Sequence, residues 1–193
     1  FAEKYYSMSP YQYGANSPVG NIDVNGDSII IKPNANGIID QIKVLFGYDT
    51  KFQKDVKADL FQLKQDDKKV ADIIGKLEES KNIHYITMPK KGEYNSTGFN
   101  ADKVKKNISQ GSEIYYNAYN RRRGRNDSDM RTPRIGLAHE LQHSFDVDKK
   151  VATYERTKNG ILLMDIRAIN TENRIRKVIG EPKRTMYLSL IHI

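Results

Sequence analysis

Apolar residues recur at helical spacing along much of the chain. Between Gly37 and Glu79 they are separated by Lys, Gln and Asp, and the clearest positions are Leu60, Leu63, Val70, Ile73, Ile74 and Leu77. Such spacing places apolar side chains on one face of a helix, where they can pack against a core. We therefore expect helices in this region.

Three short segments instead have the β-branched and aromatic composition of strands. They are residues 28–31, 83–88 and 113–116, and Pro89 ends the second of them. The polar stretch from Gly92 to Gly111 is expected to be a loop or a hairpin. Strands that alternate with helical segments in this way predict an α+β fold with a small mixed sheet.

Two further helices are expected in the C-terminal half. Thr132-Pro133 is a good helix start, because the hydroxyl can act as N-cap and proline is tolerated in the first turn. An apolar stripe follows at Ile135, Ala138, Leu141 and Phe145. The second helix lies between Ile161 and Ile179 and ends before Gly180 and Pro182.

Composition narrows the chemistry that the chain can perform. Its 193 residues include no cysteine and four histidines, so a transition metal would have to be held by His, Asp or Glu. The net charge of +8 favours acidic partners. No stretch approaches the roughly 20 apolar residues of a membrane helix, so no membrane span is expected.

The most basic segment is Arg121-Arg122-Arg123-Gly124-Arg125, which is followed by the polar residues 126–129. It is either a solvated loop or a site that attracts an acidic substrate or a nucleic acid backbone. No aromatic-interleaved module for reading bases accompanies it. A nucleic acid partner is therefore not expected, although a basic toxin directed at nucleic acid remains an alternative.

The strongest chemical motif is His139-Glu140-Leu141-Gln142-His143 on the first of the two C-terminal helices. Histidines four positions apart project from one helical face and can share a metal ion. The carboxylate of Glu140, next to the first histidine, can reach a water at the metal and act as general base. This pattern predicts a zinc-dependent peptidase.

A catalytic zinc site needs a third protein ligand. The metzincin pattern is excluded, because Asp146 and Lys149 stand where it requires Gly and His. Asp165 and Glu172 lie seven positions apart on one face of the later helix, and either could reach the metal. Glu172 could instead form an i,i+4 ion pair with Arg176.

The weaker candidates for the third ligand are Asp146, Asp148 and Glu155. Asp146 is too close to His143 along the helix to complete the metal site, and we expect it to lie behind the metal ligands. His84 and His192 are expected to be structural.

The first 27 residues differ from the rest and are rich in Tyr, Ser, Asn, Gly and Pro. The order Ser9-Pro10-Tyr11-Gln12-Tyr13, Asn16-Ser17-Pro18 and Asp23-Val24-Asn25-Gly26 resembles the closing segment of the RHS repeat-associated core of large bacterial toxins. In that family the segment ends a carrier shell, and a variable toxin domain follows it. The resemblance implies that residues 1–27 end the RHS core and that residues 28–193 form a toxin domain.

The stretch from His139 to Tyr187 resembles the NleD-like effector metallopeptidases, a zincin family of bacterial effectors and toxin domains. The resemblance rests on HELQH at residues 139–143, DIRA at 165–168, ENRIR at 172–176, GEP at 180–182 and RTMY at 184–187. The light chains of clostridial neurotoxins are similar in the HExxH motif, a later acidic ligand segment and an RxxY pair. A zincin-like fold is implied, with Zn²⁺ held by His139, His143 and Asp165, and with Glu172 as the alternative third ligand or as a residue behind the ligands.

The same resemblance implies roles for Arg184 and Tyr187. A guanidinium and a phenol aimed at the peptide carbonyl would stabilise the negative charge that develops on its oxygen. The implied function is that of a zinc endopeptidase, secreted or delivered into a target cell as part of a larger toxin. Its partners would be a target-cell protein substrate, the RHS carrier shell and a cognate immunity protein. A non-catalytic interaction domain is the other alternative.

Overall fold

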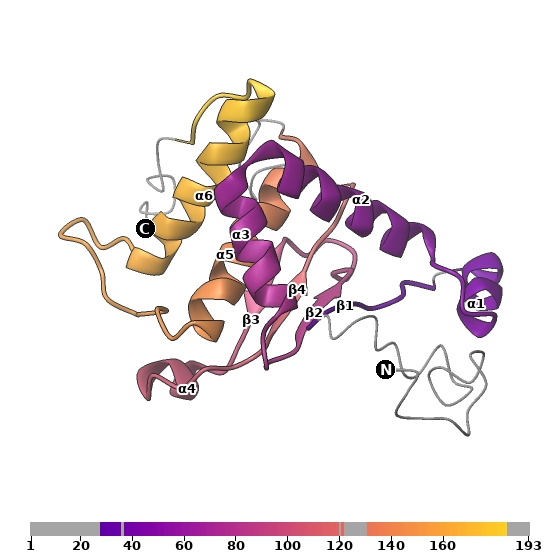
Figure 1. Ribbon diagram of the computed structural model, residues 1–193, viewed down its shortest axis with the longest axis horizontal. Helices are drawn as coiled ribbons and strands as arrows, with labels where there is room; N and C mark the ends of the chain where they lie inside the picture. The colour runs from indigo at the N-terminus through magenta and orange to yellow at the C-terminus, as the bar shows by residue number, and fades with distance from the viewer. Residues whose placement is uncertain (1–27, 36, 120, 122–130, 185–193) are drawn as a thin grey trace, which may run out of the picture.

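The computed structural model describes residues 28–35, 37–119, 121 and 131–184 (Figure 1). These residues form a mixed α+β domain with a small four-stranded sheet and six helices. In chain order the elements are β1 (Ile29–Ile31), α1 (Ile38–Leu45), α2 (Lys51–Asp66), α3 (Lys68–Glu78), β2 (His84–Thr87), β3 (Ser96–Gly98), α4 (Ala101–Lys105), β4 (Ser112–Tyr115), α5 (Pro133–Asp148) and α6 (Leu163–Ile179).

The sheet has the strand order β1-β2-β4-β3. The strands β1, β2 and β4 are parallel, and β3 pairs with β4 in the antiparallel direction at one edge. Ile86 of β2 lies opposite Ile114 of β4, and both side chains are fully buried in the core. The intervening Tyr85 and Glu113 are only half-buried, so one face of the sheet packs against helices and the other is more open to solvent.

The helices α2 and α3 begin where the sequence supplies caps. Thr50 and Gln53 form a capping box at the start of α2. Asp67 separates α2 from α3, and its carboxylate accepts hydrogen bonds from the backbone N–H groups of Lys69 and Val70. Their apolar faces then join the core, which also includes residues of the sheet, α5 and α6: Val56, Leu63, Val70, Ile74, Leu77, Ile86, Ile114, Ile135, Leu141 and Ile175.

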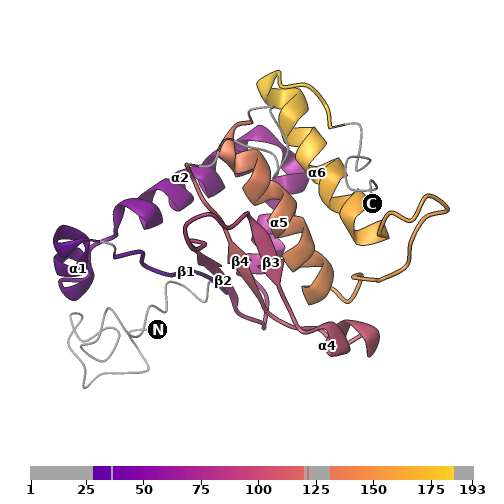
Figure 2. The same cartoon turned by 180° about the vertical axis from the view of Figure 1, so that it is seen from behind.

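Helix α5 lies between the sheet and α6 (Figures 1 and 2). It contacts β3 and β4 on one side, α2 and α3 at its flank, and α6 on the other side. Ile135, Ala138 and Leu141 are fully buried, as their apolar stripe predicts. The polar side of the helix is buried as well, because α6 covers it. Buried polar residues on such a helix indicate a candidate functional site, since burying polar groups costs free energy unless they have hydrogen-bond partners.

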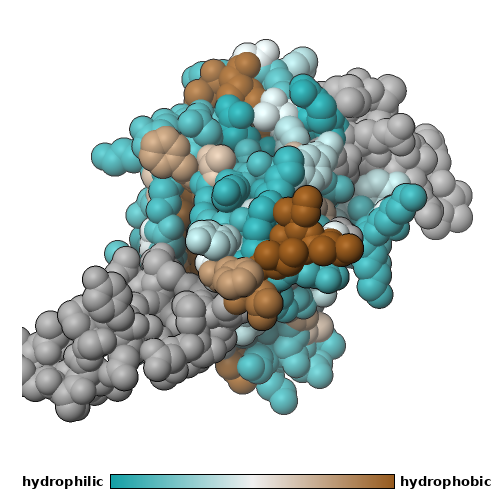
Figure 3. All heavy atoms as spheres, turned by 90° about the vertical axis from the view of Figure 1, so that its right-hand side faces the viewer, coloured by the Kyte–Doolittle hydropathy of each residue, from teal (hydrophilic) through white to brown (hydrophobic). Residues whose placement is uncertain are grey.

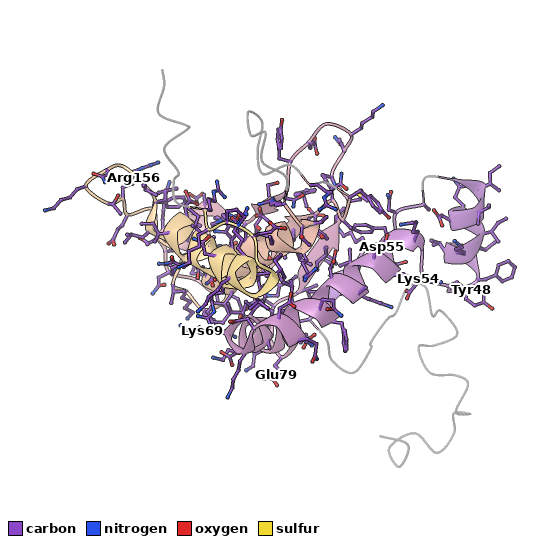
Figure 4. The ribbon with its side chains drawn as sticks, turned by 90° about the horizontal axis from the view of Figure 1, so that it is seen from above. Tyr48, Lys54, Asp55, Lys69, Glu79 and Arg156 are labelled. Atoms are coloured by element: carbon purple, nitrogen blue, oxygen red, sulfur yellow. The ribbon has the colours of Figure 1, made fainter. Side chains whose placement is uncertain are left out.

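Helix α1 is different, because none of its residues is buried. Its exposed apolar side chains gather at one end of the molecule (Figure 3), and they include Ile38, Ile39, Ile42 and Leu45. Figure 4 shows Tyr48 at this end and Arg156, on the connection between α5 and α6, at the opposite end. Figures 1 and 2 show that α1 lies far from α5, the helix that carries both predicted metal-binding histidines.

Most of the expected elements are confirmed, with two differences. The segment from Gly92 to Gly111 contains the short strand β3 and helix α4 in addition to loops. Thr132 precedes α5, but its hydroxyl donates to Glu181 Oε1 at 2.6 Å and does not cap the helix. Residues 1–27 lie outside the described part of the chain. Among the described residues, no helix combines the length and apolar character needed to cross a membrane.

Candidate active site

His139 and His143 face each other from successive turns of α5. Their Nε2 atoms are 3.2 Å apart, and both side chains are almost completely buried. Ligands bonded to zinc at about 2.0–2.1 Å in a tetrahedron lie about 3.3 Å apart. The two imidazoles therefore have the spacing of two ligands of one metal ion.

The acidic residues of α6 approach these histidines from opposite sides. Asp165 Oδ1 lies 3.7 Å from His143 Nε2, the nitrogen that faces the other histidine. Glu172 Oε2 lies 3.3 Å from His139 Nδ1, the nitrogen that faces away from it. The arrangement therefore places Asp165 on the side where a shared ion would lie and Glu172 behind His139.

Three arginines surround the fully buried carboxylate of Glu172. Arg176 donates to Oε1 at 2.8 and 3.0 Å, as the predicted i,i+4 ion pair requires, and Arg184 donates to Oε2 at 3.0 Å. Arg131 Nη1 is 3.6 Å from Oε1. Burial alone would raise the pKa of Glu172, but contact with His139 and the charges of Arg131 and Arg184 hold that pKa well below its usual range. Glu172 is therefore ionised and suited to orient the imidazole of His139.

Burial lowers the pKa of His143 to about 3, with smaller effects from His139 and Arg167. His143 is therefore neutral at pH 7, so one ring nitrogen keeps a free lone pair. Its Nδ1 atom is buried and has no hydrogen-bond partner among the described residues. A neutral imidazole with a free ring nitrogen is the form in which histidine binds a metal ion.

Glu140 is buried beside the two histidines. Its Oε2 atom accepts a hydrogen bond of 2.8 Å from the hydroxyl of Thr97 on β3. Burial raises the pKa of Glu140, although His139, Thr97 and Arg131 partly offset this effect. A carboxylate with a raised pKa is suited to take up a proton from water and to release it again.

Asp146 has no described contact with either histidine. It accepts hydrogen bonds from Gln142 at 2.7 Å and from Arg167 at 2.8 Å, while Gln142 accepts one from Thr171 at 2.6 Å. These bonds join α5 to α6 within the last two turns of α5. Asp146 therefore links α5 to α6, the two helices that carry the candidate ligands. It does not lie directly behind His143.

His84 lies in a separate buried network. Its Nδ1 atom is 2.9 Å from Ser112 Oγ, which donates to Ser144 Oγ at 2.8 Å, and its Nε2 atom is 3.7 Å from Asp148. Burial lowers the pKa of His84 below its ordinary value. The prediction that this histidine is structural agrees with these contacts.

Sequence reasoning missed Thr97, Arg131 and Gly136. A Cβ atom at Gly136 would lie 2.6 Å from Arg131 Nη2 and 2.5 Å from Asn95 Nδ2, so glycine leaves the space through which Arg131 passes beside α5. The one sequence signal for the close approach of Arg131 was Gly136 itself, three residues before His139. A glycine inside a helix usually has a packing or functional reason. Nothing in the local sequence pointed to Thr97.

The candidate ligands fit zinc only in part. Across the described residues, no group of three or more His, Cys, Asp or Glu side chains is already arranged to hold a metal ion. The two histidines have ligand spacing, whereas Asp165 is about 0.4 Å beyond that spacing from His143. The side chains therefore supply the donor types and the approximate placement that zinc requires, and the aspartate would have to move closer.

Several predicted features lie outside the described residues. They are Tyr187, His192, Arg122 to Arg125 and the RHS-like segment of residues 1–27. Arg184 is described, and its guanidinium contacts Glu172. Comparisons of the chain with models of protein families, with curated proteins and with solved structures give no match.

Proposed function

We propose that this protein is a zinc-dependent endopeptidase of zincin type, and that it acts as a toxin domain on a protein of a target cell. The observation that carries the proposal is the pair of buried Nε2 atoms, 3.2 Å apart, that His139 and His143 direct toward each other beside Glu140. The toxin context rests on the sequence resemblance alone, and so do the RHS carrier, delivery and the immunity partner.

The donor set consists of His139, His143 and Asp165. Asp165 is the better third ligand, since it approaches the nitrogen of His143 that faces His139. Glu172 contacts the opposite nitrogen of His139 and is held by Arg176 and Arg184. A carboxylate in that position fixes the tautomer and the orientation of a ligating histidine.

Zinc, when bound, supplies Lewis-acid activation of a water molecule and of the peptide carbonyl. Glu140 accepts the proton of the attacking water and later returns it to the nitrogen of the leaving amine. Its burial keeps competing water away and raises its pKa toward the value that suits both transfers. Arg184 and Tyr187 are the candidates for stabilising negative charge on the carbonyl oxygen, and of these two Arg184 lies in the described part of the chain.

The proposal is tested by zinc content and by cleavage of a peptide library, for the wild type, Glu140→Gln and His143→Ala. Glu140→Gln should retain stoichiometric zinc and cleave at least about 100-fold more slowly, because a general base contributes about 10²–10⁴-fold. His143→Ala should lose zinc and activity together. Glu79→Gln is the matched control, since it makes the same change at an exposed residue of the α3 terminus.

A wild-type protein that binds no zinc would refute the metal centre. Equal cleavage by the wild type and Glu140→Gln would refute the role of the carboxylate, even if zinc is bound.

A further inference from the structure

The carboxylate of Glu140 is held from the sheet. Thr97 Oγ1 lies 2.8 Å from Glu140 Oε2 and 3.1 Å from the backbone oxygen of the same residue. Among the described residues, no other side chain donates a hydrogen bond to this carboxylate. Its orientation therefore depends on a residue 43 positions earlier in the chain.

Thr97 occupies the central position of the edge strand β3. It pairs with Ile114 of β4, which is fully buried in the core, whereas its neighbours Ser96 and Gly98 are exposed. Paired residues of neighbouring strands point to the same face of a sheet, so Thr97 is the β3 residue that faces α5. A hydroxyl at an inward position costs free energy unless it has a hydrogen-bond partner. Glu140 is that partner.

We propose that Thr97 is the positioning residue for Glu140, and that its hydroxyl holds one carboxylate oxygen so that the other faces the reacting water. This inference rests on the proposed peptidase function. A glutamate has three rotatable side-chain bonds, and a base that samples several rotamers is in the reactive geometry for only part of the time. The bond to Oε2 restricts these rotations.

The contact between Thr97 and Glu140 can survive proton transfer, because the two events use different carboxylate oxygens. The hydroxyl of Thr97 donates to Oε2. The proton of the attacking water passes to Oε1, the oxygen that faces the water, so Oε2 keeps its lone pairs and still accepts from Thr97. The heavy atoms stay in place while the proton moves to Glu140 and then to the leaving amine.

The test compares Thr97→Val, which keeps the shape and removes the hydroxyl, with Thr97→Ser, which keeps the hydroxyl and removes the methyl group. In the zinc-loaded protein, Thr97→Val should lower kcat about tenfold or more, the loss expected for one hydrogen bond to a charged group, and change KM less than about twofold. Thr97→Ser should retain most of the activity. Both variants should retain zinc, because Glu140 is not proposed as a ligand.

Thr87→Val is the matched control on β2, which β4 separates from β3 in the sheet. The Thr87 hydroxyl makes a long bond of 3.3 Å to Glu113 on the more open face of the sheet. Its removal should leave kcat, KM and zinc content unchanged. A thermal melt of each variant separates loss of folding from loss of positioning.

The conformation of Glu140 in crystal structures of the wild type and Thr97→Val provides a readout that does not need activity. A carboxylate that turns away from its wild-type position in Thr97→Val supports the inference. An unchanged carboxylate, a Thr97→Val enzyme as active as the wild type, or a Thr97→Ser enzyme as impaired as Thr97→Val would overturn it. If the wild type cleaves nothing, the proposed function fails, and the conformation of Glu140 still decides the role of Thr97.

Discussion

Gly136→Ala tests whether the glycine of the active-site helix is required for packing. An alanine inside a helix is ordinarily more stable than a glycine by about 1 kcal/mol. At position 136, however, the added Cβ would lie 2.5 Å from Asn95 Nδ2, 2.6 Å from Arg131 Nη2 and 3.1 Å from Arg131 Cζ. These contacts are shorter than van der Waals separations, so both side chains would have to move.

The movement of Arg131 has a cost because its guanidinium is almost completely buried and lies 3.6 Å from Glu172. An exposed arginine could rotate into solvent, but a buried arginine must displace neighbouring side chains or lose its contact with a charged partner. Overpacking of this kind costs about 1–3 kcal/mol. If Arg131 moves, the charge of Glu172 stays paired with Arg176 and Arg184, so no buried charge is left without a partner. After subtraction of the helix preference of about 1 kcal/mol, we expect a net loss of up to about 2 kcal/mol.

Urea unfolding and thermal melts measure the effect. In a chain of this length 1 kcal/mol corresponds to about 2–4 °C, so the melting temperature of Gly136→Ala should fall by up to about 8 °C. The matched control is Gly75→Ala in α3, where a Cβ meets nothing within 4 Å and the melting temperature should rise. In an Arg131→Met background the cost of Gly136→Ala should shrink by at least about 0.5 kcal/mol.

The reasoning is wrong if Gly136→Ala stabilises the protein as Gly75→Ala does. It is also wrong if the cost of Gly136→Ala is the same with and without the guanidinium of Arg131, since the obstacle would then lie elsewhere.

Three further predictions concern the ends and the acidic residues of the helices. Asp67→Ala should lower the free energy of unfolding by about 1 kcal/mol, measured in urea, because Asp67 caps α3. Partial burial tends to raise the pKa of Asp67, but the contact with Arg174 holds it below its ordinary value of 3.8. The variant Asp67→Asn can still cap the helix but lacks the charge, so it should be less stable than the wild type above pH 3.8. The difference in stability should vanish as the pH falls below that value. In zinc titrations against a competing chelator, Asp165→Asn should weaken binding more than Glu172→Gln, for which a loss of about 10–100-fold is expected. The opposite ranking would identify Glu172 as the ligand.

The helix of the candidate site could be predicted because its geometry is local. Four residues of helix bring His139 and His143 to the same face whatever surrounds them. The ion pair between Glu172 and Arg176 is local in the same sense. The start of α5 at Pro133 was also predictable, since proline restricts the first turn of a helix. The partner of the Thr132 hydroxyl was not, because Glu181 is 49 positions away.

The environment of that helix could not be read from its periodicity. The stripe of Ile135, Ala138 and Leu141 predicts one buried face, yet α6 encloses the opposite side as well. Thr97 was missed for a related reason. Strand β3 has only three residues, too few for a recognisable alternation, and its position beside α5 depends on pairing with β4.

By itself, the sequence determined which residues carry the candidate chemistry: two histidines and a glutamate on one helix, and two acids on the next. Helical spacing left Asp165 and Glu172 equivalent, because residues seven positions apart share a helical face, and a resemblance between sequences was the one reason to prefer Asp165. Only the packing of α6 against α5 decided that Asp165 approaches the shared side of His143 and that Glu172 lies behind His139. The spacing of side chains within a helix follows from the backbone, whereas the offset between two packed helices follows from how all of their side chains fit together.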